Sequence, residues 1–160
     1  MDIRKRLRET LNKYGYTIVY IRADQRFRCS CYSERNGEAK ITDCSLCFGT
    51  GYKSQVERVK TRRKPLTMPE SLVAVRRTAE PGNLVVGGYT YYMEHNIVPK
   101  SGDFILEVLW SNGKPTKVKE KLKISAVDQK DGLEGRIEFY QVYARTHWLE
   151  EGDVNGINKD

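Results

Sequence analysis

Four cysteines are the residues of this chain best suited to do chemistry. They are Cys29, Cys31, Cys44 and Cys47, which form two close pairs with twelve residues between the pairs. Such an arrangement suits a tetrahedral site, because each pair supplies two thiolates from one tight turn. Four soft thiolates favour Zn²⁺ and leave no open position for a substrate. We therefore expect a structural zinc site.

Other chemistry is open to the same four cysteines. Two disulfides would form if the protein were exported, since four cysteines allow three pairings. However, residues 1–14 are charged and lack the apolar run of a signal peptide. An iron–sulfur cluster also uses four cysteines, and the thiols could stay without metal. A dithiol redox centre would need one reactive pair near a βαβ unit, which the sequence does not indicate.

The residues around the second pair resemble a known zinc module. Residues 44–51 read Cys-Ser-Leu-Cys-Phe-Gly-Thr-Gly, which is similar to the Cys-x-x-Cys-x-Gly-x-Gly modules of heat-shock co-chaperones and zinc ribbons. The first pair, Cys-Ser-Cys, is one residue shorter than in those modules. Gly49 and Gly51 can adopt positive φ, which lets backbone amides approach the sulfurs.

The sequence shows no recognisable catalytic constellation. It lacks a phosphate loop followed by Lys and Ser or Thr, a histidine-rich metal site and a nucleophile elbow. Asp103, Glu107 and Asp128 are each expected to be an exposed carboxylate on a turn or a strand face. We therefore expect no enzymatic activity and no small-molecule substrate.

The composition fits one soluble domain. The chain has 160 residues, of which 39% are hydrophobic and 31% charged. No segment approaches the roughly 18 apolar residues of a membrane span, so no membrane partner is expected. Twenty-eight Lys and Arg against 21 Asp and Glu give a net charge of +7. This mild excess favours an anionic partner.

The cysteines must be positioned by a mainly β chain. Residues 2–14 predict an amphipathic helix that Gly15 ends, with one apolar stripe; the stripe comprises Ile3, Leu7, Leu11 and Tyr14. Residues 17–22 predict a strand leading into the cysteines, and residues 33–39 a hairpin tip between the two cysteine pairs. Further strands are expected at 72–77, 89–93, 104–110, 118–126 and 136–144.

The expected fold is a small antiparallel β-barrel or sandwich in a single domain over 1–160. It comprises a helix (1–14), an inserted zinc module (27–52), a β body (53–149) and a polar tail (150–160). The alternation of apolar residues predicts one shared core. Its members are expected to be Phe104, Leu106, Val108, Leu122, Ile124, Ile137 and Phe139.

Two basic stretches are candidate surfaces for nucleic acid or an acidic partner. The first lies within residues 53–64, which hold six basic residues and one acid; its candidates are Arg58, Lys60, Arg62, Arg63 and Lys64. The second alternates along one strand and comprises Lys117, Lys119, Lys121 and Lys123. Either stretch could instead be a solvated strand face, because exposed edge strands carry lysine as protection.

The order of these motifs resembles a family of virion proteins. A short helix leads to Tyr-Ile-Arg at 20–22, the cysteine module, Val-Pro-Lys-Ser-Gly-Asp-Phe-Ile at 98–105 and Ile-Glu-Phe-Tyr-Gln-Val-Tyr-Ala at 137–144. This pattern is similar to the neck, head-closure and head–tail connector proteins of tailed bacteriophages. The resemblance implies a homo-oligomeric ring around the DNA channel of the virion, assembled in the host cytoplasm. Its expected partners are portal or adaptor proteins, tail proteins and packaged DNA, bound without sequence preference.

A second hypothesis is a cytoplasmic nucleic-acid-binding module that joins a zinc ribbon to an OB-like barrel. Bases would stack on aromatic side chains interleaved with basic strands; the candidates are Tyr89, Tyr91, Tyr92, Phe139, Tyr140 and Tyr143. Ordinary core packing is the simpler interpretation of these aromatics.

Overall fold

The computed structural model describes residues 2–41, 44–65 and 88–149. It is mainly β with one N-terminal helix, as predicted. The elements are α1 (Ile3–Tyr14), β1 (Tyr16–Arg28), β2 (Tyr32–Ser33), β3 (Glu38–Ala39), β4 (Tyr52–Pro65), β5 (Gly88–Glu94), β6 (Phe104–Ser111), β7 (Lys114–Asp131), the 3₁₀ turn η2 (Leu133–Gly135) and β8 (Ile137–Leu149). The strand expected at 72–77 and the tail at 150–160 lie outside the described residues. No described helix is long and apolar enough to cross a bilayer.

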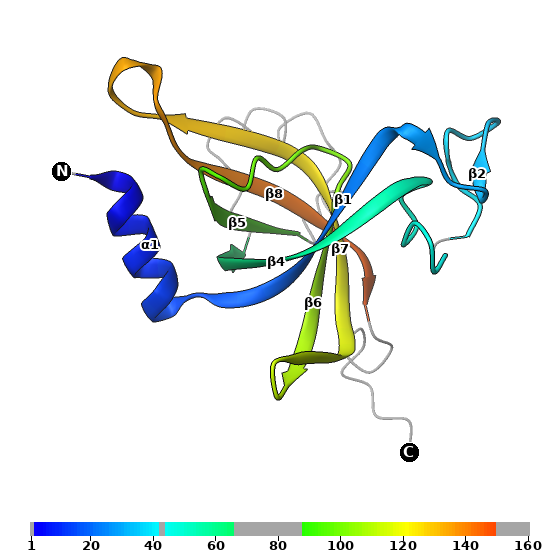
Figure 1. Ribbon diagram of the computed structural model, residues 1–160, viewed down its shortest axis with the longest axis horizontal. Helices are drawn as coiled ribbons and strands as arrows, with labels where there is room; N and C mark the ends of the chain where they lie inside the picture. The colour runs from blue at the N-terminus through cyan, green and yellow to red at the C-terminus, as the bar shows by residue number, and fades with distance from the viewer. Residues whose placement is uncertain (1, 42–43, 66–87, 150–160) are drawn as a thin grey trace, which may run out of the picture.

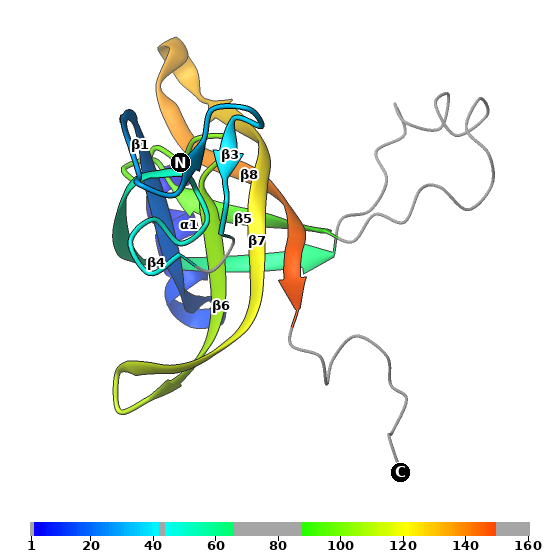
Figure 2. The same ribbon diagram turned by 90° about the vertical axis from the view of Figure 1, so that its right-hand side faces the viewer.

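Six long strands close into an antiparallel barrel in the order β1-β4-β5-β8-β7-β6. β7 is the longest strand because it pairs with β6 over its first half and with β8 over its second; Figure 2 shows these three strands side by side. The Asn112-Gly113 turn joins β6 to β7 as the sequence predicted, with both residues at positive φ. β1 and β6 complete the ring through three residue pairs.

The helix lies across one end of the barrel, and Figure 1 shows it opposite the end that carries the cysteines. The Asp2 side chain caps it by accepting from the Arg4 N–H. A Cβ at Gly15 would lie 2.4 Å from the Leu11 carbonyl and 2.8 Å from that of Thr61, so only glycine lets the chain turn here. Of the expected apolar stripe, only Leu11 is buried. Arg4 instead joins the helix to β8 by donating to the Ile137 carbonyl.

The barrel core takes its side chains from all six strands. It comprises Ile18, Tyr20, Val59, Tyr91, Met93, Ile105, Leu122, Ile124, Tyr140, Val142 and Ala144. The expected core face was correct on β7, where Leu122 and Ile124 are buried, but wrong on β6. On β8 the expectation was correct for Ile137, which packs against the core, and wrong for Phe139, which is not part of it. Ile105 points inward on β6, whereas Leu106 and Val108 are half-exposed on the outside.

The error has a physical cause, because both faces of β6 and β8 carry apolar residues. Alternation alone cannot then say which face is interior. Strand pairing decides which face of β6 is interior. Ile105 lies opposite Tyr20 of β1 and Leu122 of β7, both of which are core residues. Phe104 is buried on the outer face, where its ring contacts the ring of His147.

A polar network centred on Glu107 lies inside the barrel. The Tyr16 and Tyr91 hydroxyls donate to the same Glu107 oxygen at 2.6 and 2.7 Å. Arg63 lies 3.6 Å from Glu107 and 3.2 Å from Glu120, and its guanidinium covers the Tyr89 ring. A buried carboxylate is tolerated only with such partners.

Replacing Tyr91 with Phe should destabilise the fold, because Glu107 then loses one of its two hydroxyl donors. We expect the free energy of unfolding to fall by about 1–3 kcal/mol, measured by urea denaturation. Tyr14→Phe is the matched control, because Tyr14 is mostly exposed on the helix, and it should change stability by less than about 0.5 kcal/mol. Equal stability of the two variants would contradict the role given to the network.

The protein should also lose stability in alkali. Burial, followed by hydrogen bonding to Glu107 or Asp103, raises the pKa of Tyr16 and Tyr20 above the usual value near 10; burial and the charge of Glu107 do the same for Tyr91. Above about pH 10 the unfolded chain releases these phenolic protons while the folded chain holds them, so stability falls as pH rises. Urea midpoints at increasing pH should decline from about pH 10 onward, and less steeply for Tyr91→Phe. A flat profile would argue against burial of the hydroxyls.

Candidate metal centre and basic surface

The four cysteine sulfurs form one cluster, as the spacing predicted. All four lie within 4.8 Å of one another. Cys29 and Cys44 are 3.9 Å apart and Cys31 and Cys47 are 3.3 Å apart. A tetrahedral ion with metal–sulfur bonds of about 2.3 Å needs sulfur separations of about 3.8 Å. The two separations in this cluster lie on either side of that value. The four thiols are free, and these separations are well beyond the roughly 2.05 Å of a disulfide.

Two turns of the inserted segment between β1 and β4 bring the sulfurs together. In the first, the Tyr32 N–H donates to the Cys29 carbonyl, after which β2 and β3 form the expected small hairpin. In the second, the N–H groups of Phe48 and Thr50 donate to the carbonyls of Cys44 and Cys47. Phe48 and Gly49 adopt positive φ, which folds the chain back below the sulfurs.

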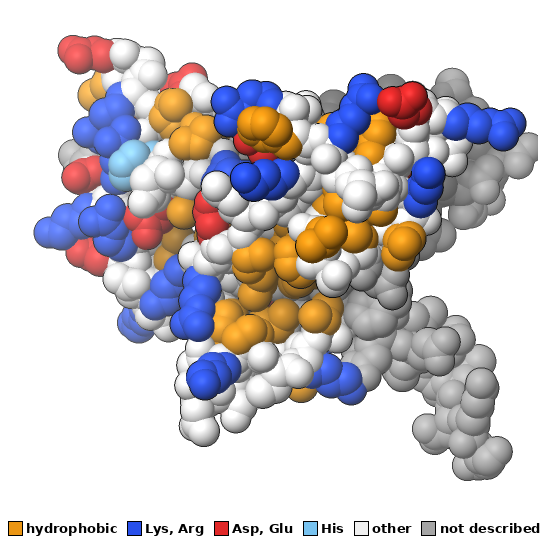
Figure 3. Space-filling model, turned by 45° about the vertical axis from the view of Figure 1, so that its right-hand side comes forward, with side chains coloured by type: hydrophobic (Ala, Val, Ile, Leu, Met, Phe, Trp, Pro, Cys, Tyr) orange, Lys and Arg blue, Asp and Glu red, His pale blue; other side chains and the backbone are white. Residues whose placement is uncertain are grey.

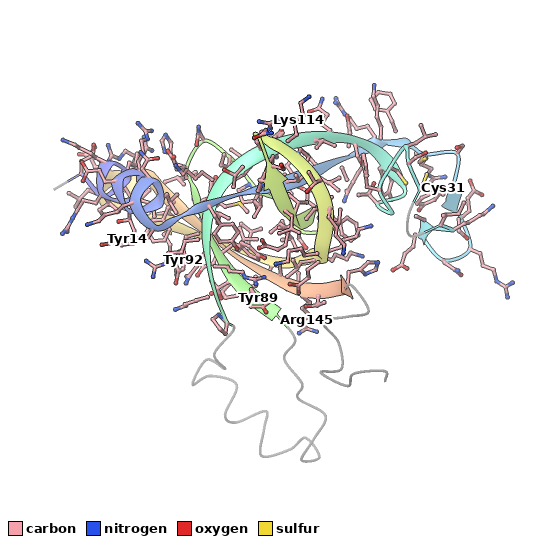
Figure 4. The ribbon with its side chains drawn as sticks, turned by 90° about the horizontal axis from the view of Figure 1, so that it is seen from below. Tyr14, Cys31, Tyr89, Tyr92, Lys114 and Arg145 are labelled. Atoms are coloured by element: carbon pink, nitrogen blue, oxygen red, sulfur yellow. The ribbon has the colours of Figure 1, made fainter. Side chains whose placement is uncertain are left out.

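The inserted segment is anchored where it leaves the barrel. The Cys29 N–H donates to the Gly51 carbonyl at 2.8 Å, which joins the two ends of the insertion. The hydroxyls of Thr50 and Ser54 both donate to the Cys47 carbonyl. A Cβ at Gly51 would meet the Tyr32 ring at 3.0 Å, so the glycine lets the two turns pack. Figure 4 shows Cys31 at the end of the molecule opposite Tyr14.

The backbone prepares one thiolate before any metal binds. The N–H groups of Cys47 and Leu46 donate to the sulfur of Cys44 and lower its pKa to about 6. A hydrogen bond with Cys47 raises the pKa of Cys31 to about 12 because it favours the protonated thiol. A bound cation would displace the remaining protons, since thiolates are the ligand form of cysteine. The cluster can thus hold one soft metal ion with four sulfur ligands.

A barrel lysine holds the cysteine module in place. Lys121 of β7 is buried, and its Nζ donates to the Phe48 carbonyl in the second turn. Its ammonium group also covers the Phe104 ring. Lys121 was predicted to face DNA or a partner, and the structure gives it this internal contact instead. Residues 48 and 121 are far apart in the sequence, so no local pattern predicts the contact between them.

The first basic stretch does not form a single surface. Arg63 points inward to Glu120 and Glu107, which corrects its expected place on a partner surface. The other four candidates are stacked on aromatic rings or bonded to the helix. Arg58 covers Trp110, Arg62 covers Tyr14, Lys64 covers Tyr92, and Lys60 donates to Asn12. On β7, Lys117, Lys119 and Lys123 are exposed.

Asp103, Glu107 and Asp128 have separate partners. Asp103 is buried and the Glu107 side chain is only 12% exposed, so these two are not the exposed carboxylates that the sequence predicted. Asp103 accepts from the Tyr20 hydroxyl and the Ala23 N–H, Glu107 lies in the network described above, and Asp128 pairs with Lys130. Asp103 ends the Val-Pro-Lys-Ser-Gly-Asp turn, whose Gly102 has a φ of +90°. This motif therefore closes one end of the barrel.

No protein-family model matches the sequence, and no curated protein matches it significantly. The features of this chain that bear on function are therefore the cysteine cluster, the exposed surfaces and the order of the motifs.

Replacing Cys44 with Ser should abolish metal binding, because three thiolates remain and the ligand most readily deprotonated is lost. We expect bound metal to fall from about one ion per chain to near zero, measured by elemental analysis after dialysis. The barrel should keep its β-sheet circular dichroism, since none of its strands contains a cysteine of the cluster.

Ser45→Ala is the matched control for this experiment, because it changes a residue of the same turn and keeps all four cysteines. It should bind metal as the unchanged protein does. Full metal content in Cys44→Ser would contradict the four-sulfur site.

Proposed function

We propose that this chain is a structural protein of a tailed-phage virion, forming a homo-oligomeric ring in the neck between head and tail. The observation that carries the proposal is the distribution of exposed apolar side chains. Seven of the nine large ones among the described residues lie on the helix, on the inserted segment, or near the ends and hairpin turns of the barrel strands. They are Ile3, Tyr14, Phe27, Ile41, Leu46, Leu109 and Leu133.

The projections point in different directions from a small centre. In Figure 1, α1 and the cysteine module lie at opposite ends of the long axis, and the β6–β7 and β7–β8 hairpins extend below and above the barrel. Exposed apolar groups at such tips favour contact with other protein chains. A subunit that contacts neighbours on several sides suits a closed ring with further proteins above and below it.

The barrel itself fits the role of a scaffold. Its interior is filled by the apolar core and by the Glu107 network. A filled barrel supports surface contacts, whereas a ligand-binding barrel encloses a cavity.

In this proposal the metal is Zn²⁺ and its role is structural. Four thiolates saturate a tetrahedral ion, which leaves no position for a reacting molecule. The ion joins two turns with few buried apolar groups, because Cys31 and Cys47 are the buried hydrophobic residues among the described residues of the insertion. Zinc thereby makes a rigid projection from a short segment.

The expected partners are portal or adaptor proteins, tail proteins and packaged DNA. Contacts to DNA in such a channel would use phosphate charge without reading sequence. The net charge of +7 and the exposed lysines of β7 support this. Two of the proposed base-stacking residues argue against the alternative nucleic-acid-binding module, because Tyr91 and Tyr140 lie in the core.

Self-association tests the proposal directly. The purified chain, loaded with zinc, should form a discrete species several times its 18.5 kDa mass, measured by light scattering and native mass spectrometry. Any DNA binding should weaken steeply with added salt and show no sequence preference. A chain that stays monomeric at millimolar concentration, or that binds one DNA sequence selectively, would contradict the ring.

A further inference from the structure

Arg58 and Lys60 of the first basic stretch and Lys123 of the second lie on one outer face of the barrel. Strand pairing places Arg58 opposite Val19 and Lys60 opposite Thr17, at the β4 side of this face. It places Lys123 opposite Phe104 at the β7 side. Paired residues of an antiparallel sheet share a face. These three residues, far apart in sequence, therefore border the same surface.

An apolar patch lies between these two basic borders. It is formed by half-exposed Leu106, Val108 and Trp110 of β6 and Val118 of β7. Val108 and Val118 are directly paired, and Arg58 covers the Trp110 ring. Figure 3 shows apolar side chains gathered in the middle of the molecule with basic groups around them. A partner for this patch needs an apolar group accompanied by negative charge.

The tip of the β7–β8 hairpin, formed by Leu133 and Glu134, offers an apolar group beside a negative charge. Leu133 is 92% exposed, the highest value among the large apolar residues of the described chain. Glu134 follows it with a φ of +60°, so the turn is held in a conformation that non-glycine residues seldom adopt. Among the described residues, the Glu134 carboxylate has no ion-pair partner, whereas the nearby Arg136 pairs with Glu138. The tip thus presents one leucine beside a free acid.

We propose that Leu133 of one copy docks on the patch of Leu106, Val108, Trp110 and Val118 of the next copy, with Glu134 between its basic borders. This inference rests on the proposed ring and identifies the contact that builds it. In Figure 1 the hairpin tip lies at the upper left, whereas β6 extends below the barrel. Tip and patch are separate surfaces, so the contact is head-to-tail, and such contacts close into rings when the rotation allows.

Single variants at each surface test the contact. Leu133→Asp and Val108→Asp should each weaken self-association by about ten-fold or more, since a buried apolar anchor dominates such interfaces. Arg58→Glu is a gentler patch variant that leaves the apolar residues in place. Val98→Asp is the matched control, because Val98 is exposed at 47% and lies between β5 and β6, in neither the hairpin tip nor the patch. Circular dichroism and metal content verify that each variant is folded.

Mixing two defective variants gives the sharpest result. Leu133→Asp keeps an intact patch and Val108→Asp keeps an intact tip, so one good contact can form between them. An equal mixture should yield a heterodimer of twice the chain mass and no larger species, detected by native mass spectrometry. A contact of tip with tip, or of patch with patch, would give no such heterodimer and would overturn the proposal.

The failure of this inference can be distinguished from failure of the proposed function. If the unchanged protein forms a ring and Leu133→Asp forms the same ring with equal affinity, the tip contact is wrong while the ring stands. If the unchanged protein is monomeric at millimolar concentration, the ring and the contact both fail. Loss of assembly in Val98→Asp as well would show a nonspecific effect of added charge and would also overturn the assignment.

Discussion

The closure of the sheet between β1 and β6 is the contact on which the rest of the structure depends. Three residue pairs make it: Val19 with Leu106, Tyr20 with Ile105, and Ile21 with Phe104. They connect the first strand of the barrel to a strand more than eighty residues later. Because side chains alternate along a strand, these pairs also decide which face is interior. A shift of one residue would bury Leu106 and expose Ile105.

Polar side chains inside the barrel reinforce this register. Glu107 follows Ile105 on the inward face of β6, and it meets the hydroxyls of Tyr16 from β1 and Tyr91 from β5. Asp103, just before β6, accepts from Tyr20 of β1. Each bond requires a specific alignment of strands distant in sequence, since a buried carboxylate without donors is costly. The network therefore favours one closure of the sheet over shifted ones.

The closed barrel also explains how a metal-binding segment can be inserted early in the chain. β1 and β4 are antiparallel neighbours, and Arg28 lies opposite Tyr52 where the insertion begins and ends. The inserted segment therefore starts and finishes at one place. The β1–β4 register shifts only next to it, between Asp24 and Arg28, and is regular from Tyr16 to Asp24. Its position is then defined by local hydrogen bonds and by Lys121, which reaches it from β7.

The sequence by itself determined the elements and the grouping of the cysteines. The helix, the Asn112-Gly113 hairpin and the four-sulfur cluster depend on residues close together in the sequence. The spacing of such residues is enough to predict their local geometry. Tertiary structure alone decided the inward face of β6, the internal positions of Arg63 and Lys121, and the placement of Arg58, Lys60 and Lys123 around one apolar patch. Those features depend on which strands pair. Both faces of a strand in this chain carry apolar residues, so only the closure of the barrel distinguishes inside from outside.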